Sequence, residues 1–111
     1  MKRIVDEGYV RLLISMNLKR LRTLHKISQL ELAEKADLSA NFINDIESGK
    51  KGISIETLTK LCLALHAEPF QFFITNEMLD GKVPPYLFDV NNTIQWMLND
   101  LTSQYKQKSD G

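Results

Sequence analysis

The sequence predicts an all-α protein with five helical segments in one domain and an additional helix near the C-terminus. Apolar residues recur at intervals of three and four along most of the chain, as they do on one face of an α-helix. No stretch alternates apolar and polar residues for long enough to predict a strand, and serine, glycine and proline separate the helical stretches. With 111 residues, of which 43% are apolar and 25% charged, the chain has the size and composition of about one domain.

The first two helices are predicted by an apolar face and by a capping signal. The first ends near residue 24, and the apolar residues of its face are Val10, Ile14, Leu18, Leu21 and Leu24. The second begins at Gln29, because Ser28 and Glu31 form a capping-box pattern, and it ends near Ala36. Its apolar residues are Leu30, Leu32 and Ala33.

The later helices follow the same signals. Ser39 can cap a third helix that ends at Gly49, and Ser54 can cap a fourth. The third carries Phe42, Ile43 and Ile46, and the fourth carries Leu58, Leu61, Cys62 and Leu65. A short fifth segment is expected around residues 69–73. The C-terminal helix has Asp89 as its N-cap, and its apolar residues are Val90, Ile94, Met97, Leu98, Leu101 and Tyr105.

A cluster of glycine and proline residues at positions 80–85 predicts a hinge. We therefore expect a domain over residues 9–79, and a hinge with the C-terminal helix over residues 80–111. An isolated helix of that length is marginal in water, so its apolar face needs a partner surface.

The net charge at pH 7 is zero, but the charge is unevenly distributed. Residues 1–26 hold seven basic and two acidic residues, a net of +5, whereas residues 27–51 and 52–111 have nets of −2 and −3. Any face for nucleic acid must therefore be local, and the alternative is an ordinary solvated helix surface.

Several classes of protein are disfavoured. Cys62 is the only cysteine, which removes an intrachain disulfide and multi-cysteine zinc sites and favours a reducing, cytoplasmic setting. The N-terminus does not resemble a signal peptide, and no apolar stretch approaches the ~20 residues that span a bilayer. His25 and His66 have no partners at metal-ligand spacing, and no catalytic motif is present. We expect no metal, no cofactor and no enzymatic activity.

The informative stretch is residues 29–47, where two short helices are separated by three or four residues. This is the spacing of a helix-turn-helix unit, which sets one helix across the phosphate backbone and the next into the major groove. Such a unit needs a small residue at the helix crossing, a turn residue that tolerates positive φ, and apolar anchors on the second helix. These roles fall in order to Ala33, Asp37, Ile43 and Ile46.

Over residues 14–74 the sequence resembles the lambda-repressor-like (Cro/CI, Xre-type) helix-turn-helix DNA-binding family. The resemblance rests on Leu18-x-x-Leu-Arg22, Ser28-Gln29-x-Glu31-Leu32-Ala33, Ile46-Glu47-Ser48-Gly49-Lys50 and Ser54-Ile55-Glu56-Thr57-Leu58. It implies that Arg22 pairs with Glu47 and braces the first helix against the recognition helix. The alternative is an ordinary surface ion pair worth ~0–1 kcal/mol.

The resemblance also implies contacts to the DNA backbone. The residues at or beside these positions are Gln29, Ser28, Ser39, Ser48, Lys50 and Lys51. Helix capping is an equally good role for the serines. Asn17, Lys19 and Arg20 extend this basic face, unless the first helix turns one or two of them to solvent.

Base reading is expected from the outward positions of the third helix, which are Ala40, Asn41, Asn44 and Asp45. Many members of the family have Arg, Gln or Lys in place of Ala40 and Asp45. Because an unpaired carboxylate near phosphates is costly, Asp45 either pairs with a basic residue of the protein or excludes wrong sequences. Phe42 is expected in the core, with a contact to DNA as the alternative.

The C-terminal helix predicts a homodimer. Its expected interface residues are Ile94, Trp96, Met97, Leu101 and Tyr105. The alternative is that this helix covers its own core. The whole pattern predicts a sequence-specific DNA-binding transcriptional regulator that acts as a homodimer on an operator with two half-sites. The alternative is a protein-interaction module or antitoxin-type partner-binding protein with the same fold. Phage repressor, restriction-modification controller and antitoxin roles are not distinguished.

Overall fold

The computed structural model describes residues 5–82, 94, 95 and 97–103, and these residues form helices and connecting loops with no strand. The all-α prediction is confirmed. The chain divides into two compact units, one ending at Thr75 and one starting at Asn76. The helices of the first unit are α1 (Glu7–Leu24), α2 (Gln29–Ala36), α3 (Ala40–Glu47), α4 (Ile55–Leu65) and the 3₁₀ helix η1 (Pro69–Phe73). The second unit contains α5 (Asn76–Leu79) and a helical stretch at residues 94, 95 and 97–103.

Three of the helices begin at the predicted serine caps. Ser28 accepts a hydrogen bond from the backbone N–H of Glu31, and the Glu31 carboxylate accepts one from the backbone N–H of Ser28, which completes the capping box. Ser39 and Ser54 each accept a hydrogen bond from the backbone N–H three residues later. Each cap satisfies a backbone donor that the helix itself leaves without a partner.

The turn between α2 and α3 depends on one residue with a left-handed backbone. Asp37 has φ 55° and ψ 51°, and the following amide of Leu38 donates to the carbonyl of Ala33 at 2.9 Å. Aspartate tolerates this region better than most residues with a side chain, so the prediction for Asp37 is confirmed. Gly49, just after α3, has φ 80°, where glycine is the favoured residue.

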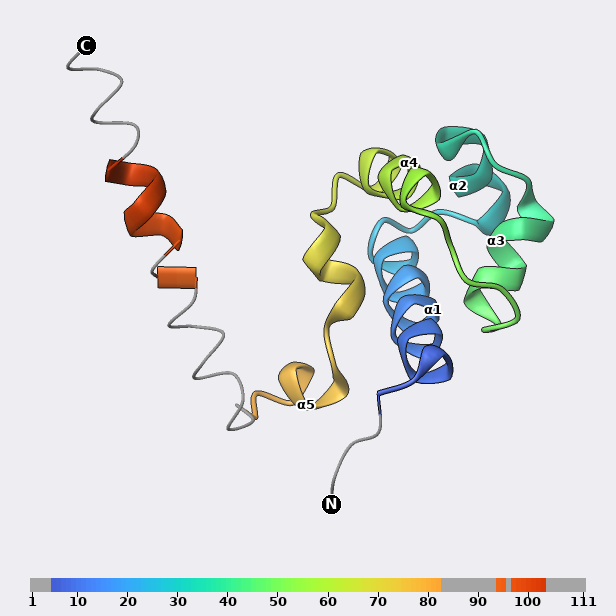
Figure 1. Cartoon of the computed structure of the whole chain (residues 1–111). Coiled ribbons are helices and arrows are strands. Elements are labelled where there is room, and N and C mark those ends of the chain that lie inside the picture. The colour runs from blue at the N-terminus through green and yellow to red at the C-terminus, as the bar shows by residue number, and fades with distance from the viewer. Residues whose placement is uncertain (1–4, 83–93, 96, 104–111) are drawn as a thin grey trace, which may run out of the picture. The chain divides into compact units, whose positions relative to one another are not determined.

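The core of the first unit lies where four helices and η1 meet. α1 lies between η1 and α3 and packs against both, while α2 packs against α3 and α4 (Figure 1). The buried apolar residues are Ile14, Leu18, Leu21, Leu32, Ala33, Ala36, Ile43, Ile46, Leu61, Leu65 and Phe72. Phe42 and Cys62 are half-buried and pack against this core.

Two leucines that the apolar pattern assigned to buried faces are exposed. Leu24 is 70% exposed because it is the last residue of α1, where the chain turns away from the core. Leu30 is 58% exposed and lies in the first turn of α2. For both residues the predicted burial is wrong.

Asn17 is fully buried, so the prediction that it extends a basic face is wrong. Its Nδ2 donates to the carbonyls of Leu13 and Phe72, both at 2.8 Å, and to that of Ile74 at 3.1 Å. Its Oδ1 accepts a hydrogen bond from Nη1 of Arg20. Asn17 therefore fastens α1 to η1 and to the residue that follows η1.

Desolvation, with a smaller contribution from the charge of Glu68, raises the pKa of the Cys62 thiol. Because the thiolate is the reactive species, we expect iodoacetamide to modify the folded protein slowly at neutral pH. The rate should rise with pH through a midpoint above the usual thiol pKa. Mass spectrometry of protein quenched at several pH values measures this rate, and the protein unfolded in urea is the control. Equal rates in the folded and unfolded protein would contradict the expectation.

No helix within the described ranges is both long enough and apolar enough to cross a membrane.

Candidate nucleic-acid interface

α2, the turn at Asp37 and α3 form the helix-turn-helix unit. Ile43 and Ile46 are buried under α3, which leaves the opposite side of that helix in solvent. Asn41 and Asn44 are exposed on α3. Ala40 and Asp45 are half-buried, and Ala40 packs against the core. The exposed side of α3 therefore presents two amide side chains.

Arg22 of α1 and Glu47 of α3 form a two-pronged ion pair. Arg22 Nε lies 2.7 Å from Glu47 Oε2, and Arg22 Nη2 lies 2.9 Å from Glu47 Oε1. The Glu47 side chain is only 4% exposed and that of Arg22 16%. The hydrogen bonds with Glu47 raise the pKa of the Arg22 guanidinium, which keeps it charged at physiological pH.

The same arginine also reaches the loop between α1 and α2. Its Nη1 donates to the carbonyl of Ile27 at 2.9 Å. One side chain thus holds α1, the entry to α2 and the end of α3 in fixed relative positions. The geometry is that of a bracing pair, and it is far more buried than an ordinary surface ion pair.

Gln29, the first residue of α2, uses both ends of its amide within the protein. Its Nε2 donates to Glu47 Oε1 at 3.2 Å, and its Oε1 accepts from Nδ2 of Asn44 at 3.3 Å. A hydrogen-bonded chain therefore runs from Arg22 through Glu47 and Gln29 to the exposed Asn44. Sequence reasoning missed this connection, since it depends on how closely α2 approaches α3.

Asp45 is paired with a basic residue of the protein. Lys51 Nζ lies 3.4 Å from Asp45 Oδ2 and 6.0 Å from the centre of the Phe42 ring. The backbone amides of Lys50 and Lys51 both donate to the carbonyl of Asp45, which folds the loop back onto the end of α3. The negative charge that α3 would otherwise present is thereby offset.

The residues predicted to contact the DNA backbone lie at helix ends and in the loop after α3. Ser28 and Ser39 use their hydroxyl oxygens as cap acceptors, so each O–H remains a donor. Ser48 donates its hydroxyl to the carbonyl of Asp45 at 3.2 Å. Lys50 is exposed.

The model of a helix-turn-helix family, HTH_3, matches residues 18–72. The control protein C.BamHI of Bacillus amyloliquefaciens is 33% identical over 61 residues, which are 54% of this chain and 75% of that protein. The chain belongs to the HTH_3 helix-turn-helix family. It is therefore a DNA-binding transcription regulator, and the predicted family resemblance is confirmed.

Solved structures of the HTH_3 type share this arrangement of helices. The restriction-modification controller protein C.AhdI from Aeromonas hydrophila superposes with a TM-score of 0.55 at 30% identity, covering 57% of this chain and 96% of that one. An HTH_3 family transcriptional regulator from Vibrio cholerae gives a TM-score of 0.61 at 27% identity, covering 67% of this chain and 42% of that one.

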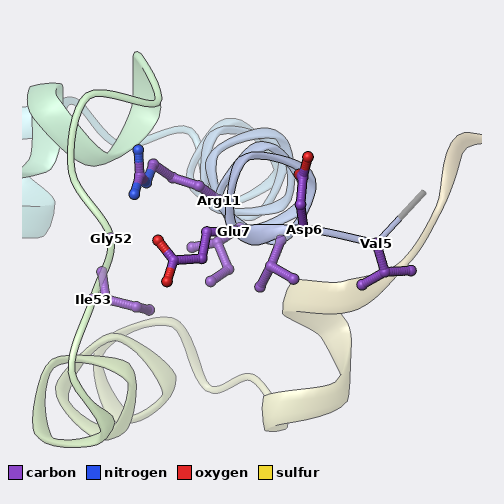
Figure 2. A pocket seen from close by; sticks show the side chains of 8 residues that line it. Val5, Asp6, Glu7, Arg11, Gly52 and Ile53 are labelled. Atoms are coloured by element: carbon purple, nitrogen blue, oxygen red, sulfur yellow. The ribbon is translucent and has the colours of Figure 1, made fainter.

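The described residues also form a surface pocket of about 500 Å³. It is formed by the start of α1 and the loop before α4, and Glu7 and Arg11 line it on the side of α1 that faces Gly52 and Ile53 (Figure 2). Val10 and Ile14 add apolar lining. None of the predicted site residues of this HTH_3 chain lines the pocket.

In the second unit, the described residues of the predicted dimer interface are exposed. Ile94, Met97 and Leu101 are each about half exposed, as is Leu98. Trp96 and Tyr105 were predicted to belong to the same interface and lie outside the described residues. In the HTH_3 domain itself, Leu63 and Phe70 are further large apolar side chains in solvent, and the sequence patterns did not single them out.

Proposed function

We propose that this HTH_3 regulator binds a specific operator as a homodimer, with the α3 helix of each subunit in the major groove of one half-site. The observation that carries the proposal is the braced recognition helix. Arg22 and Glu47 fix the end of α3, and the exposed Asn41 and Asn44 project from it. Asparagine side chains bond base edges in the major groove, where each base pair has a distinct pattern of donors and acceptors.

The proposed base-reading residues are Ala40, Asn41, Asn44 and Asp45. Ala40 can contact a thymine methyl group. Asp45 is held by Lys51, so its proposed part is to disfavour guanine and thymine, which present mainly acceptors. The proposed phosphate contacts come from Gln29, Ser28, Ser39, Ser48, Lys50 and Lys51.

The proposed dimer contact is the apolar row of the C-terminal helix. Ile94, Met97, Leu98 and Leu101 recur at intervals of three and four, as a helical interface requires. A two-fold dimer would place two recognition helices about one DNA turn apart and double the phosphate contacts. The similarity to C.BamHI and C.AhdI supports a controller role in a restriction-modification system, with the protein acting in the cytoplasm.

A protein-interaction module is the second candidate, and one observation favours it. α3 contains no basic residue and carries the acidic Asp45, whereas the attraction of DNA for proteins is largely electrostatic. The exposed apolar row at residues 94–101 would then contact a different protein.

Selection of bound duplexes from a random pool, followed by titration at two salt concentrations, tests the proposed function. We expect an inverted repeat with half-sites about one turn apart. The Lys50→Ala and Lys51→Ala variants should weaken binding to all sequences and lower the salt dependence by about one counterion per lost contact. Lys35→Ala, which removes an exposed lysine outside the predicted contacts, is the matched control.

Two outcomes would contradict parts of the proposal. The absence of sequence enrichment would support the protein-interaction module. A monomer by light scattering at micromolar concentration would rule out the homodimer. If the dimer forms, Leu101→Glu should convert it to monomer and weaken operator binding, because it places a charge in the apolar row.

A further inference from the structure

In the hydrogen-bonded chain from Arg22 to Asn44, it is fixed which group donates and which accepts. The reason is Glu47, whose carboxylate can only accept hydrogen bonds. Two donors from Arg22 and one from Gln29 Nε2 converge on its two oxygens. Because the Glu47 side chain is only 4% exposed, water cannot readily replace these donors.

This direction sets the orientation of the Gln29 amide. The Nε2 end must face Glu47, because a rotated amide would place Oε1 against a carboxylate oxygen, and both atoms are acceptors. The Oε1 end consequently faces Asn44, three residues before Glu47 on α3. There it accepts a hydrogen bond from Nδ2 of Asn44 at 3.3 Å.

The orientation of Asn44 follows in turn. Its Nδ2 is directed at Gln29, so its Oδ1 lies at the other end of the amide, on the exposed side of α3. Within the part of the chain that the structure describes, no donor bonds this oxygen. Asn41, by comparison, makes no side-chain hydrogen bond to any described residue, so its amide can turn either way.

We propose that Gln29 is a positioning residue that orients the Asn44 amide, so that α3 offers the acceptor Asn44 Oδ1 to the base pair it reads. The inference rests on the proposed function and adds to it a preferred base chemistry. In the major groove, adenine N6 and cytosine N4 are donors, whereas guanine and thymine present acceptors at the corresponding edge. Asn44 therefore selects adenine or cytosine, the bases whose exocyclic amino group lies in the major groove. At guanine or thymine the Asn44 Oδ1 acceptor finds no donor, unless the amide rotates and loses its bond to Gln29.

The role differs from the phosphate contact that the family resemblance implies for Gln29, and the two roles can be separated. Loss of a phosphate contact weakens binding to all sequences alike. Loss of a positioning contact instead relaxes the preference at one base pair.

The test measures binding of the full chain to the selected operator and to variants with each base pair at each position, by fluorescence anisotropy. Asn44→Ala identifies the position that Asn44 reads. Two further variants change Gln29. Gln29→Met removes both polar ends of the amide at similar length. Gln29→Lys keeps a donor for Glu47 and adds attraction for phosphate, but it offers no acceptor to Asn44.

Both Gln29 variants should reduce the preference for amino over keto bases at the Asn44 position from about tenfold to less than threefold. Preferences at the Asn41 position should stay unchanged, which is the internal control. In the Asn44→Ala background, either change at Gln29 should have no further effect on specificity. A uniform loss of affinity with an unchanged base preference would overturn the proposal.

A second measurement decides the orientation without DNA. In the free protein, the heteronuclear NOE of the Asn44 side-chain amide should be higher than that of Asn41 and should fall to the Asn41 level in Gln29→Met. Equal values for the two asparagines in the unmodified protein would overturn the positioning role. Failure to select any DNA sequence would contradict the proposed function instead, and the NOE measurement tells the two failures apart.

Discussion

Replacing Arg22 with alanine is expected to lower the free energy of unfolding by about 3–5 kcal/mol. The cost arises because the nearly buried Glu47 carboxylate would lose both of its charged hydrogen bonds and keep only the donor from Gln29. The truncation also removes the bond to the carbonyl of Ile27. Urea unfolding followed by far-UV circular dichroism measures the change.

The matched control for Arg22→Ala is an ion pair of α4 in which Glu56 is exposed and Lys60 is half-buried. Glu56 and Lys60 lie one helical turn apart, with 3.9 Å between their charged atoms, and the Glu56 side chain is 81% exposed. Lys60→Ala should cost no more than about 0.5 kcal/mol, since solvent screens such pairs. An Arg22→Ala effect of that same small size would mean that the pair does not brace the domain.

Arg22→Ala should also weaken operator binding. The loss of affinity should be larger than the loss of folded protein alone would cause. The end of α3 would lose its fixed position relative to α1. The Glu47 side chain, which starts the hydrogen bonds through Gln29 to Asn44, would become mobile. Binding measured well below the unfolding temperature separates this effect from instability. A second variant, Arg22→Met with Glu47→Leu, should recover much of the stability without recovering affinity, because it removes the unpaired charge but not the need for orientation.

The Asn17→Leu variant should be destabilised by about 3 kcal/mol, the second large effect. Leucine has the same branching and the same number of side-chain heavy atoms as asparagine, so the loss comes mainly from hydrogen bonding, with some crowding by the larger methyl groups. The carbonyls of Phe72 and Ile74 would be left without the Nδ2 donor. The control is Lys19→Leu, which changes an exposed position of the same helix and should stay within about 0.5 kcal/mol.

Urea unfolding of both variants under identical conditions checks this expectation. If Asn17→Leu were as stable as the unmodified protein, the carbonyls of Phe72 and Ile74 would have to find other donors or water. Destabilisation of Lys19→Leu by a similar amount would instead show that α1 tolerates no leucine on its outer face.

The elements that the sequence predicts well are those determined by local contacts. Ser28, Ser39 and Ser54 each need only a backbone amide three residues away, so their short patterns locate the helix starts. Asp37 likewise acts through its own φ angle. The spacing of apolar residues predicted most of the core. Ile14, Leu18 and Leu21, for example, are separated by four and three residues, as on one face of a helix.

The errors concern contacts between segments that are distant in the sequence. Asn17 lies three residues after Ile14 and four before Leu21, so its position indicated burial, but its polar side chain suggested a surface role. Its partners are 55 and 57 residues away, and no local pattern identifies carbonyls at that distance. In the candidate site, the resemblance to a family supplied the Arg22–Glu47 contact, whereas the bonds through Gln29 needed the relative placement of α2 and α3.

The hydrogen bonds of Asn17 also determine the smallest piece of this chain that can be moved into another protein. They join the first helix of the domain to its last helical segment, η1, and to the residue that follows η1. A fragment that stops before Phe72 would therefore keep every residue of the helix-turn-helix unit and still leave the Asn17 amide on α1 without two of its three acceptors. A graft that carries DNA recognition into a fusion protein must include both ends of the domain, from the start of α1 through Thr75.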